Sequence, residues 1–311
     1  MPLWGFLLSF ATAILWAASP IMVGRGMALS KCTSNEINPI RSISFFLVTL
    51  VVAFVHTRGN IPLVLAPKAL FYIAGNVLMG YIVGDVLYFI AIREIGISLA
   101  VPVSNSYPML VVLTSWLFLG EKITLQIVFG VVVVIAGLLL LRFGGFKELS
   151  DEEAELERRI GLSKLMKGFL FAIGAGIAWA IGAPLTKMAM ETSGLGPIEI
   201  TFYRAIALLV MSWTYRFVLI KYRPESIMPL SKIPISGWAY FLGAAVVGLA
   251  MGSILYATCI RVMPVAVVTA ITATSPLIAA LFAHFVLKEK LRSMQWTGVV
   301  LIIIGSITVS L

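Results

Sequence analysis

Residues 84–93 read GDVLYFIAIR, and residues 252–261 read GSILYATCIR. The two stretches share five residues in the same register, at a shift of 168 positions (252 minus 84). Downstream, the same shift relates Pro108 to Pro276, Glu121-Lys122 to Glu289-Lys290, and Gly137 to Gly305. Repetition of this kind in an apolar chain indicates two structural repeats with a site at their interface.

The similarity also extends upstream, at a shift of 163 positions (179 minus 16). This shift relates Trp16 to Trp179, Glu36 to Glu199 and Arg41 to Arg204. A difference of five residues (168 minus 163) in the loop after the second helix of each repeat reconciles the two shifts. We therefore divide the chain into a first repeat over 1–143, a polar linker over 144–164 and a second repeat over 165–311.

The composition is that of a membrane protein, because 60% of the residues are hydrophobic and only 12% are charged. Soluble domains average about 25% charged residues. Apolar runs of roughly 20 residues, long enough to cross a bilayer, recur along the chain. We predict ten transmembrane helices, at about 3–24, 37–56, 69–92, 97–119, 123–142, 165–188, 197–220, 235–259, 265–287 and 292–310. Five helices per repeat is an odd number, which predicts an all-α, multi-pass protein of the cell membrane with two inverted repeats.

The remaining composition excludes several other classes of protein. The net charge of +9 would suggest a nucleic-acid partner in a soluble protein, but here Lys and Arg gather at helix ends, so no nucleic-acid partner is expected. Their distribution alone places the loops after odd-numbered helices in the cytosol and both termini outside. Cys32 and Cys259 are isolated, so we expect no disulfide, metal site or cofactor. The first span lacks a positive n-region and is interpreted as a retained helix.

Proline residues interrupt several predicted spans at matching places. Pro108 and Pro276 each leave a backbone carbonyl without its helical N–H, and Pro20 and Pro184 do the same near the start of each repeat. Unpaired backbone groups at this depth are tolerated only against protein or a wet cavity. The neighbouring polar residues are Ser104, Asn105 and Tyr107 in the fourth span and Thr272 and Ser275 in the ninth. We predict that these segments line a cavity and act as hinges, although an ordinary proline kink would also explain one such break.

The third and eighth spans carry a stripe of small residues beside a polar face. Asn76, Gly80 and Gly84 correspond to Ala244, Gly248 and Gly252, and spacing of this kind lets helix backbones approach closely. At 100° per residue, Tyr81, Asp85 and Tyr88 share one face of the third span. The equivalent face of the eighth span has Leu249, Ser253 and Tyr256. The two repeats therefore keep the last tyrosine in common and differ at the acid.

Asp85 is the acidic residue that lies deepest in a predicted span. A carboxylate at this depth is costly and usually faces the interior of the bundle, where it serves ions, protons or substrates. Burial favours its neutral form and makes a coupling proton possible, whereas a nearby arginine favours the charged form. The structural alternative is an aspartate that ties two helices together.

Other candidate residues have two interpretations each. Arg41 and Arg204 either snorkel to the interface or reach an anionic group of a substrate. Trp16 and Trp179 either wall the cavity or only pack against other side chains. His284 either lies at the membrane interface, which we expect, or relays protons. The fifth and tenth spans have glycines seven residues apart, which favours helix packing or a dimer contact, so the chain is a monomer or a homodimer. These glycines are Gly130, Gly137, Gly298 and Gly305.

The doubled pattern resembles the drug/metabolite transporter superfamily, in particular its ten-helix members with two EamA-type repeats. The features that carry the resemblance are Pro108 and Pro276, the Trp-Ala pairs at 16–17 and 179–180, and the segments LGEK at 119–122 and LKEK at 287–290. The resemblance implies a central cavity lined by helices one to four and six to nine, with helices five and ten at the periphery. It also implies alternating access, and both termini in the cytosol, in conflict with the charge count.

We therefore predict a carrier or facilitator of small metabolites, such as amino acids or related polar or amphipathic compounds, in which each four-helix bundle rocks around the site. Its partners are the lipid bilayer and the small-molecule substrate. A carrier of sugar phosphates or nucleotide sugars and an exporter of drug cations are alternatives. An intramembrane enzyme would need a converging nucleophile, base or metal ligands, which the sequence does not supply. A channel-like bundle would not need paired hinges.

Overall fold

The computed structural model describes residues 2–30, 32–62, 66–105, 107–143, 162–275, 277–278, 281 and 293–310. In these ranges the regular structure is helical and no strand occurs, which confirms the predicted all-α class. The first repeat contains α1 (Leu3–Ser30), α2 (Ser34–His56), α3 (Pro67–Val77), η1 (Leu78–Gly84), α4 (Asp85–Ser104), α5 (Pro108–Leu119) and α6 (Leu125–Phe143). The second repeat contains α8 (Leu162–Ser193), α9 (Pro197–Tyr222), α10 (Ile235–Ala244), η4 (Ala245–Gly252), α11 (Ser253–Val262), α12 (Val265–Thr272) and α14 (Ser293–Ser310).

Two short 3₁₀ turns, η2 (Pro224–Ser226) and η3 (Leu230–Lys232), connect α9 to α10. Within the described residues, six helical segments are long and apolar enough to span a membrane, in agreement with a multi-pass membrane protein. They are Leu3–Ser30, Asn35–His56, Pro67–Ile95, Lys164–Ser193, Pro197–Tyr222 and Ile235–Val262.

Local sequence signals account for several helix ends. α3, α5 and α9 each begin with a proline, whose missing N–H is not needed in the first turn. α2 begins with a capping box, in which Thr33 and the Glu36 carboxylate satisfy free backbone N–H groups. Gly120 ends α5 in a left-handed conformation (φ 63°), which glycine adopts without strain. The predicted boundary between the third and fourth spans, at 93–96, was wrong, because helix continues from α3 through η1 and α4 to Ser104. Two other bounds also differ, since α1 continues to Ser30 and α8 already begins at Leu162, inside the predicted linker.

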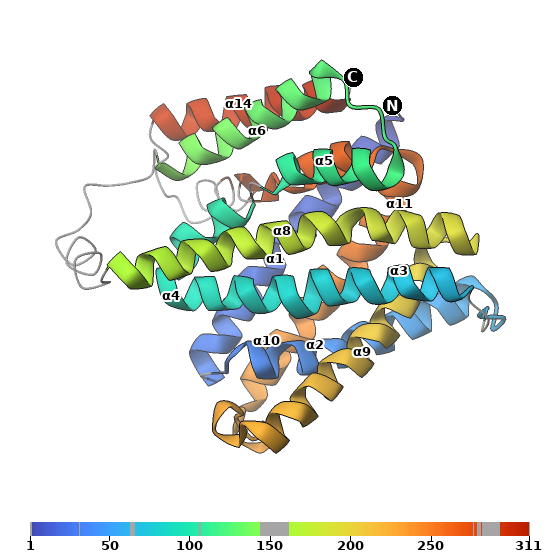
Figure 1. Ribbon diagram of the computed structural model, residues 1–311, viewed down its shortest axis with the longest axis vertical. Coiled ribbons are helices and arrows are strands. Elements are labelled where there is room, and N and C mark those ends of the chain that lie inside the picture. The colour runs from blue at the N-terminus through green and yellow to red at the C-terminus, as the bar shows by residue number, and fades with distance from the viewer. Residues whose placement is uncertain are drawn as a thin grey trace.

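The two repeats have opposite orientations in the bundle. In Figure 1, the chain runs from α3 on the right to α4 on the left, whereas the equivalent segment runs from α10 on the left to α11 on the right. The two chain ends lie close together at the upper right of the same view. The first helix of each repeat packs against the other repeat, because α1 contacts α10, η4 and α11, and α8 contacts α3, η1 and α4. Each bundle is therefore assembled from both repeats.

The fifth helix of the first repeat, α6, packs along α14, the last helix of the second (Figure 1). A Cβ added to Gly137 would lie 2.8 Å from the Gly298 carbonyl oxygen, and one added to Gly305 would lie 2.7 Å from the Val134 nitrogen. A Cβ at Gly130 would lie 2.6 Å from a methyl group of Val309. These glycines thus serve helix packing within the chain, which was one of their two predicted roles.

Candidate substrate-binding cavity

The two repeats enclose a cavity of about 610 Å³. This volume lies within the range of small-molecule sites, about 300–1,000 Å³. Most of the site residues that we predicted from the sequence line it. They are Trp16, Pro20, Arg41, Tyr81, Asp85, Tyr88, Asn105, Tyr107, Trp179, Arg204, Ser253, Tyr256, Thr272 and Ser275. Their convergence follows from the physics of the span, since a polar side chain in an apolar helix avoids lipid.

Ser104 is the predicted site residue that lies elsewhere. It is fully buried, and its hydroxyl donates a hydrogen bond to the carbonyl of Ala172 in α8 (3.2 Å). Its own carbonyl, which Pro108 deprives of a helical partner, accepts from the Tyr107 N–H (3.3 Å). The prediction of Ser104 as a cavity residue was wrong, because a hydroxyl beside a helix break can bond to a neighbouring backbone instead.

The predicted hinge prolines occupy different positions. Pro108 begins α5, and α4 ends four residues earlier, at Ser104. Pro20 and Pro184 lie inside α1 and α8, which continue through them, and of these two only Pro20 lines the cavity. Pro276 and His284 are outside the described residues. The hinge role stays a prediction.

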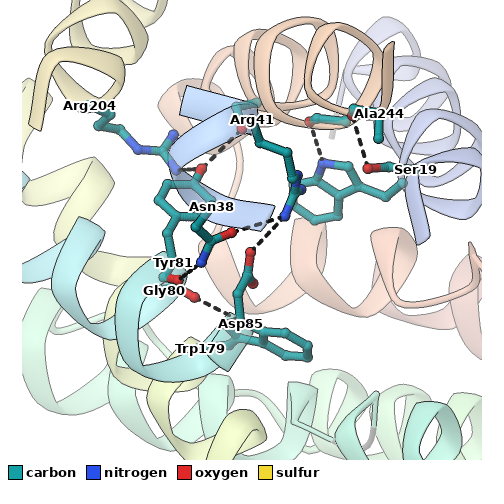
Figure 2. Close-up of polar contacts among 12 residues, drawn as sticks. Ser19, Asn38, Arg41, Gly80, Tyr81, Asp85, Trp179, Arg204 and Ala244 are labelled. Carbon is teal, nitrogen blue, oxygen red and sulfur yellow. Dashed lines mark hydrogen bonds and ion pairs between the residues drawn. The ribbon is translucent and has the colours of Figure 1, made fainter. Parts of the chain in front are cut away.

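Asp85 forms a buried ion pair with Arg41. The Arg41 Nη1 lies 3.1 Å from the Asp85 Oδ2, and the exposed fractions of the two side chains are 7% and 14%. The same nitrogen lies 3.3 Å from the Asn38 Oδ1, and the Asn38 amide donates to the carbonyl of Tyr81 (2.7 Å). Figure 2 shows these groups converging between α2 and the start of α4. Arg41 therefore points inward and does not snorkel.

Arg204 also points inward, but it has no acidic partner among the described residues. Its Nε donates to the Asn76 Oδ1 (2.7 Å) and its Nη2 to the Tyr81 hydroxyl (2.5 Å). The guanidinium lies over the Tyr81 ring, 5.4 Å from its centroid. The side chain is buried, with 5% of the residue exposed, and its Nη1 has no hydrogen-bond partner in the described part of the chain. Arg41 also has a donor without a partner in this part of the chain, its Nε, so each of the two arginines that line the cavity has one unsatisfied donor.

Two short π-helices, η1 and η4, interrupt the third helix of each repeat at the cavity. Such segments often mark functional sites, and they release backbone carbonyls from the α-helical pattern. The Trp179 indole donates to the carbonyl of Gly80 in η1 (3.0 Å), and the Trp16 indole donates to the carbonyl of Gly248 in η4 (3.1 Å). In each case the tryptophan and the carbonyl belong to different repeats, so two equivalent hydrogen bonds join the repeats.

The glycines of the small-residue stripes make room for these indoles. A Cβ at Gly84 would lie 2.6 Å from Trp179, and one at Gly252 would lie 2.6 Å from Trp16. The stripe was predicted to bring helix backbones together, but at Gly84 and Gly252 the close neighbour is mainly an aromatic side chain. Tyrosines complete each wall, since the ring centroids of Trp16 and Tyr256, and of Trp179 and Tyr88, are 5.1 Å apart.

The cavity reaches much closer to one end of the bundle than to the other. On one side it extends to Met27, three residues before the end of α1, and to Gln295, two residues after the start of α14. Leu138 of α6 lies at the same end. The resemblance placed helices five and ten at the periphery, but α6 and α14 each contribute one residue to this mouth, Leu138 and Gln295. We call the side with these three residues the open side.

The opposite side, which we call the sealed side, is closed by a polar contact and an apolar layer. Glu121 accepts a hydrogen bond from Lys187 (2.9 Å), and its two oxygens accept from the backbone N–H of Val265 at the start of α12 (2.9 and 3.0 Å). This contact joins the end of the first repeat's α5 to two helices of the second repeat. The buried residues Met263, Val265, Ala266, Ala189 and Met190 belong to one continuous apolar cluster beside it.

Comparison with known proteins identifies the chain. The model of the EamA-like transporter family matches residues 3–143 and again residues 166–311. The chain belongs to the EamA-like transporter family. The two matches agree with the repeats that the sequence indicated, and the family supports a membrane transporter as the general function of this protein.

Relatives of this EamA-like transporter are themselves named only as transporters. An uncharacterized transporter of Archaeoglobus fulgidus is 23% identical over 301 residues, which covers 96% of this chain and 95% of the relative. The uncharacterized transporter YvbV of Bacillus subtilis is 24% identical over 199 residues, covering 63% of this chain and 57% of the relative. A solved crystal structure has a similar fold, with a TM-score of 0.73 at 17% identity, and covers 99% of this chain and 98% of that one.

Two residues that contact the cavity arginines of this EamA-like transporter were missed or misinterpreted in the sequence. Asn38 was overlooked because a polar residue in the first turns of a helix is common, and Asn76 was considered only as a small residue. Both amides orient an arginine. Among the described residues, no group of three or more His, Cys, Asp or Glu side chains is placed to hold a metal ion.

Proposed function

We propose that this protein is a secondary carrier or facilitator that moves a small, amphipathic metabolite across the membrane by alternating access. The observation that carries the proposal is the one-sided reach of the cavity. Met27 and Gln295 bring its mouth to one end of the bundle, while Glu121 and the apolar cluster around Met263 close the other end. A carrier requires a site that is exposed to one side at a time.

The composition of the cavity supports an amphipathic substrate. The indoles of Trp16 and Trp179 and the rings of Tyr88 and Tyr256 provide apolar surface that also accepts cations. Arg204, Asn105 and Tyr107 provide polar groups at the same cavity. Small-molecule sites combine apolar walls with a few placed polar groups in this way.

The sealed side is built from contacts that a rigid-body movement can break. Glu121 is partly exposed, and its partners Lys187 and Val265 belong to α8 and α12 of the other repeat. Separation of α5 from these helices, with closure near Met27, would turn the cavity to the other side.

Reconstitution into liposomes tests the proposal. A carrier gives saturable uptake and counterflow, in which unlabelled substrate inside the vesicle drives accumulation of labelled substrate from outside. Conductance that does not saturate would indicate a channel instead. Chemical conversion of the added metabolite without transport would indicate an enzyme. Either result would overturn the proposal.

The ion pair at the cavity provides a separate test of coupling. We propose that Asp85 changes between its pairing with Arg41 and a protonated state as the cavity turns from one side to the other. The Asp85→Asn variant cannot make this change, so its uptake should be strongly reduced and should lose any dependence on a pH gradient. A single monodisperse peak in size-exclusion chromatography in detergent, which shows that the variant is folded, is the control, and uptake is normalised to the amount of folded protein. Normal uptake with unchanged pH dependence would return Asp85 to a structural role.

A further inference from the structure

We infer that Arg204 binds a carboxylate of the substrate. This carboxylate would lie near Ser253, the position at which the second repeat has no equivalent of Asp85. The inference rests on the proposed transport function and specifies the chemical class of its substrate. It also predicts which end of the substrate lies beside Arg204.

The argument begins with the broken symmetry between the repeats. Arg41 and Arg204 are equivalent residues, and each points into the same cavity. The first repeat provides Asp85 as the counterion of Arg41 at 3.1 Å. The residue equivalent to Asp85 is Ser253, which is neutral. The second repeat therefore has the cation without its acid.

Ser253 nevertheless lies beside Arg204, because both side chains contact one oxygen atom. The Tyr81 hydroxyl accepts a hydrogen bond from the Arg204 Nη2 (2.5 Å) and lies 3.2 Å from the Ser253 Oγ. Figure 2 shows Arg41 bonded to Asp85, and Arg204 on the other side of Tyr81. An external carboxylate in this region would complete the second ion pair, as Asp85 completes the first.

The charges at the cavity favour an anion. Among the described lining residues, Asp85 is the only acid, and Arg41 already neutralises it. Arg204 remains as a buried cation whose contacts are neutral oxygens, with Nη1 unsatisfied in the described part of the chain. A buried charge without a counterion is strongly unfavourable. A carboxylate would remove this penalty and gain a charge-assisted hydrogen bond.

The other walls select the remainder of the molecule. Trp16 packs against Tyr256, and Trp179 packs against Tyr88 and Tyr107. A carboxylic acid with an aromatic or branched apolar body would place its charge at Arg204 and its body against these rings. A substrate whose only charge is a cation would meet no free acid in the described lining.

Matched ligand pairs test this inference on the purified protein. The probes are 3-phenylpropionate, 4-methylpentanoate and indole-3-propionate, each compared with its neutral amide and its amine, and binding is measured by the shift of the melting temperature. We expect at least one acid to bind about 10- to 100-fold more tightly than its amide, as expected for one charged hydrogen-bonded contact. If no acid is bound more tightly than its amide, the inference is wrong. Equal stabilisation by chloride or sulfate would show that the site takes inorganic anions, which also overturns it.

Two variants assign the preference to Arg204. Arg204→Gln should remove the difference between acid and amide while it preserves a hydrogen-bonding side chain. Ser253→Asp provides the missing acid from the protein itself, and it keeps the test valid if Arg204→Gln does not fold. This variant should bind the acids about 10-fold or more weakly and melt at a higher temperature than the wild type. Ser253→Asn, of similar size but uncharged, is its control and should retain the acid preference. Unchanged acid binding in Ser253→Asp would contradict the inference.

Counterflow in liposomes separates the inference from the proposed function. Equal exchange of an acid and its amide, insensitive to Arg204→Gln, would support transport and overturn the anion site. Acid-selective binding that depends on Arg204, without exchange of any probe across the membrane, would support the anion site and count against transport.

Discussion

The ion pair between Arg41 and Asp85 permits a quantitative prediction about stability. Removing one partner of a buried pair costs about 3–5 kcal/mol, because the other charge remains without compensation. Here the exposed fractions of the side chains are 7% and 14%, and the pair lines a cavity that is open on one side. We therefore expect the lower end of this range, about 3 kcal/mol, for Asp85→Asn. Arg41 would keep its hydrogen bond with Asn38 and its position over the Phe89 ring, 6.0 Å from the centroid, but would lose its acidic partner.

A double-mutant cycle isolates the contribution of the pair. Arg41→Gln leaves the Asp85 carboxylate alone and should cost a similar amount, whereas the double variant places two neutral amides together and should cost about 1 kcal/mol. The sum of the destabilisations of the two single variants should therefore exceed the destabilisation of the double variant by at least about 2 kcal/mol. The free energies are measured by reversible unfolding with sodium dodecyl sulfate in mixed detergent micelles.

An exposed pair serves as the matched control for this cycle. Arg93 and Glu94 lie 3.4 Å apart, and 61% of the Arg93 side chain is exposed. Arg93→Gln should change the unfolding free energy by no more than about 1 kcal/mol. Additive single costs for Arg41→Gln and Asp85→Asn, within about 0.5 kcal/mol, would refute the claim that these two residues stabilise each other.

Three further predictions concern the packing and the sealed side. Gly137→Val should cost about 1–3 kcal/mol, seen as a lower melting temperature in detergent, because its Cβ would meet the α14 backbone; unchanged melting would exclude this contact. Trp16→Phe and Trp179→Phe should each cost about 1–3 kcal/mol, because each removes the indole N–H from a π-helix carbonyl, and markedly unequal unfolding free energies would contradict the equivalence of the two contacts. Glu121→Gln should weaken the contact that closes the sealed side and so favour the state in which that side is open. In this background, the cysteine of Met263→Cys should react faster with an impermeant maleimide, and the cysteine of Met27→Cys should react more slowly. Equal changes in both labelling rates would show general loosening instead.

The sequence predicted the arrangement of the spans well because two physical constraints are local. A helix must be long and apolar to cross a bilayer, and this pattern is visible in any window of about 20 residues. A polar residue within such a span must avoid lipid, so Asp85, Asn105, Tyr107 and Thr272 could be assigned to one cavity without knowledge of their partners.

Contacts between distant segments could not be predicted in the same way. Arg41 and Asp85 are on different helices, so their separation along the chain does not predict how close they lie in space. The π-helices were missed because Gly80 and Gly248 read equally well as small residues for close helix packing. Trp16 and Trp179 reach the carbonyls of these π-helices only because the first helix of each repeat packs against the other repeat.

The distribution of symmetric and asymmetric residues at the cavity has a physical explanation. Trp16 and Trp179 make equivalent contacts, because each indole donates to a π-helix carbonyl. Both repeats have such a carbonyl, so both need a hydrogen-bond donor at this position. A small metabolite has no such symmetry. A cavity of two identical halves would offer it two equivalent orientations, and neither half could specialise in its charged or its apolar end.

Recognition of one orientation therefore requires that the repeats differ where they touch the substrate. Some of the differences between the repeats lie in that region, since Asp85, Asn105 and Tyr107 of the first repeat correspond to Ser253, Ala273 and Ser275 of the second, and all six residues line the cavity. The structural contacts stay paired while the polar contacts diverge. A serine in place of an acid at position 253 fits the anion site that we infer, because this difference leaves intact the two indole contacts that hold the repeats together.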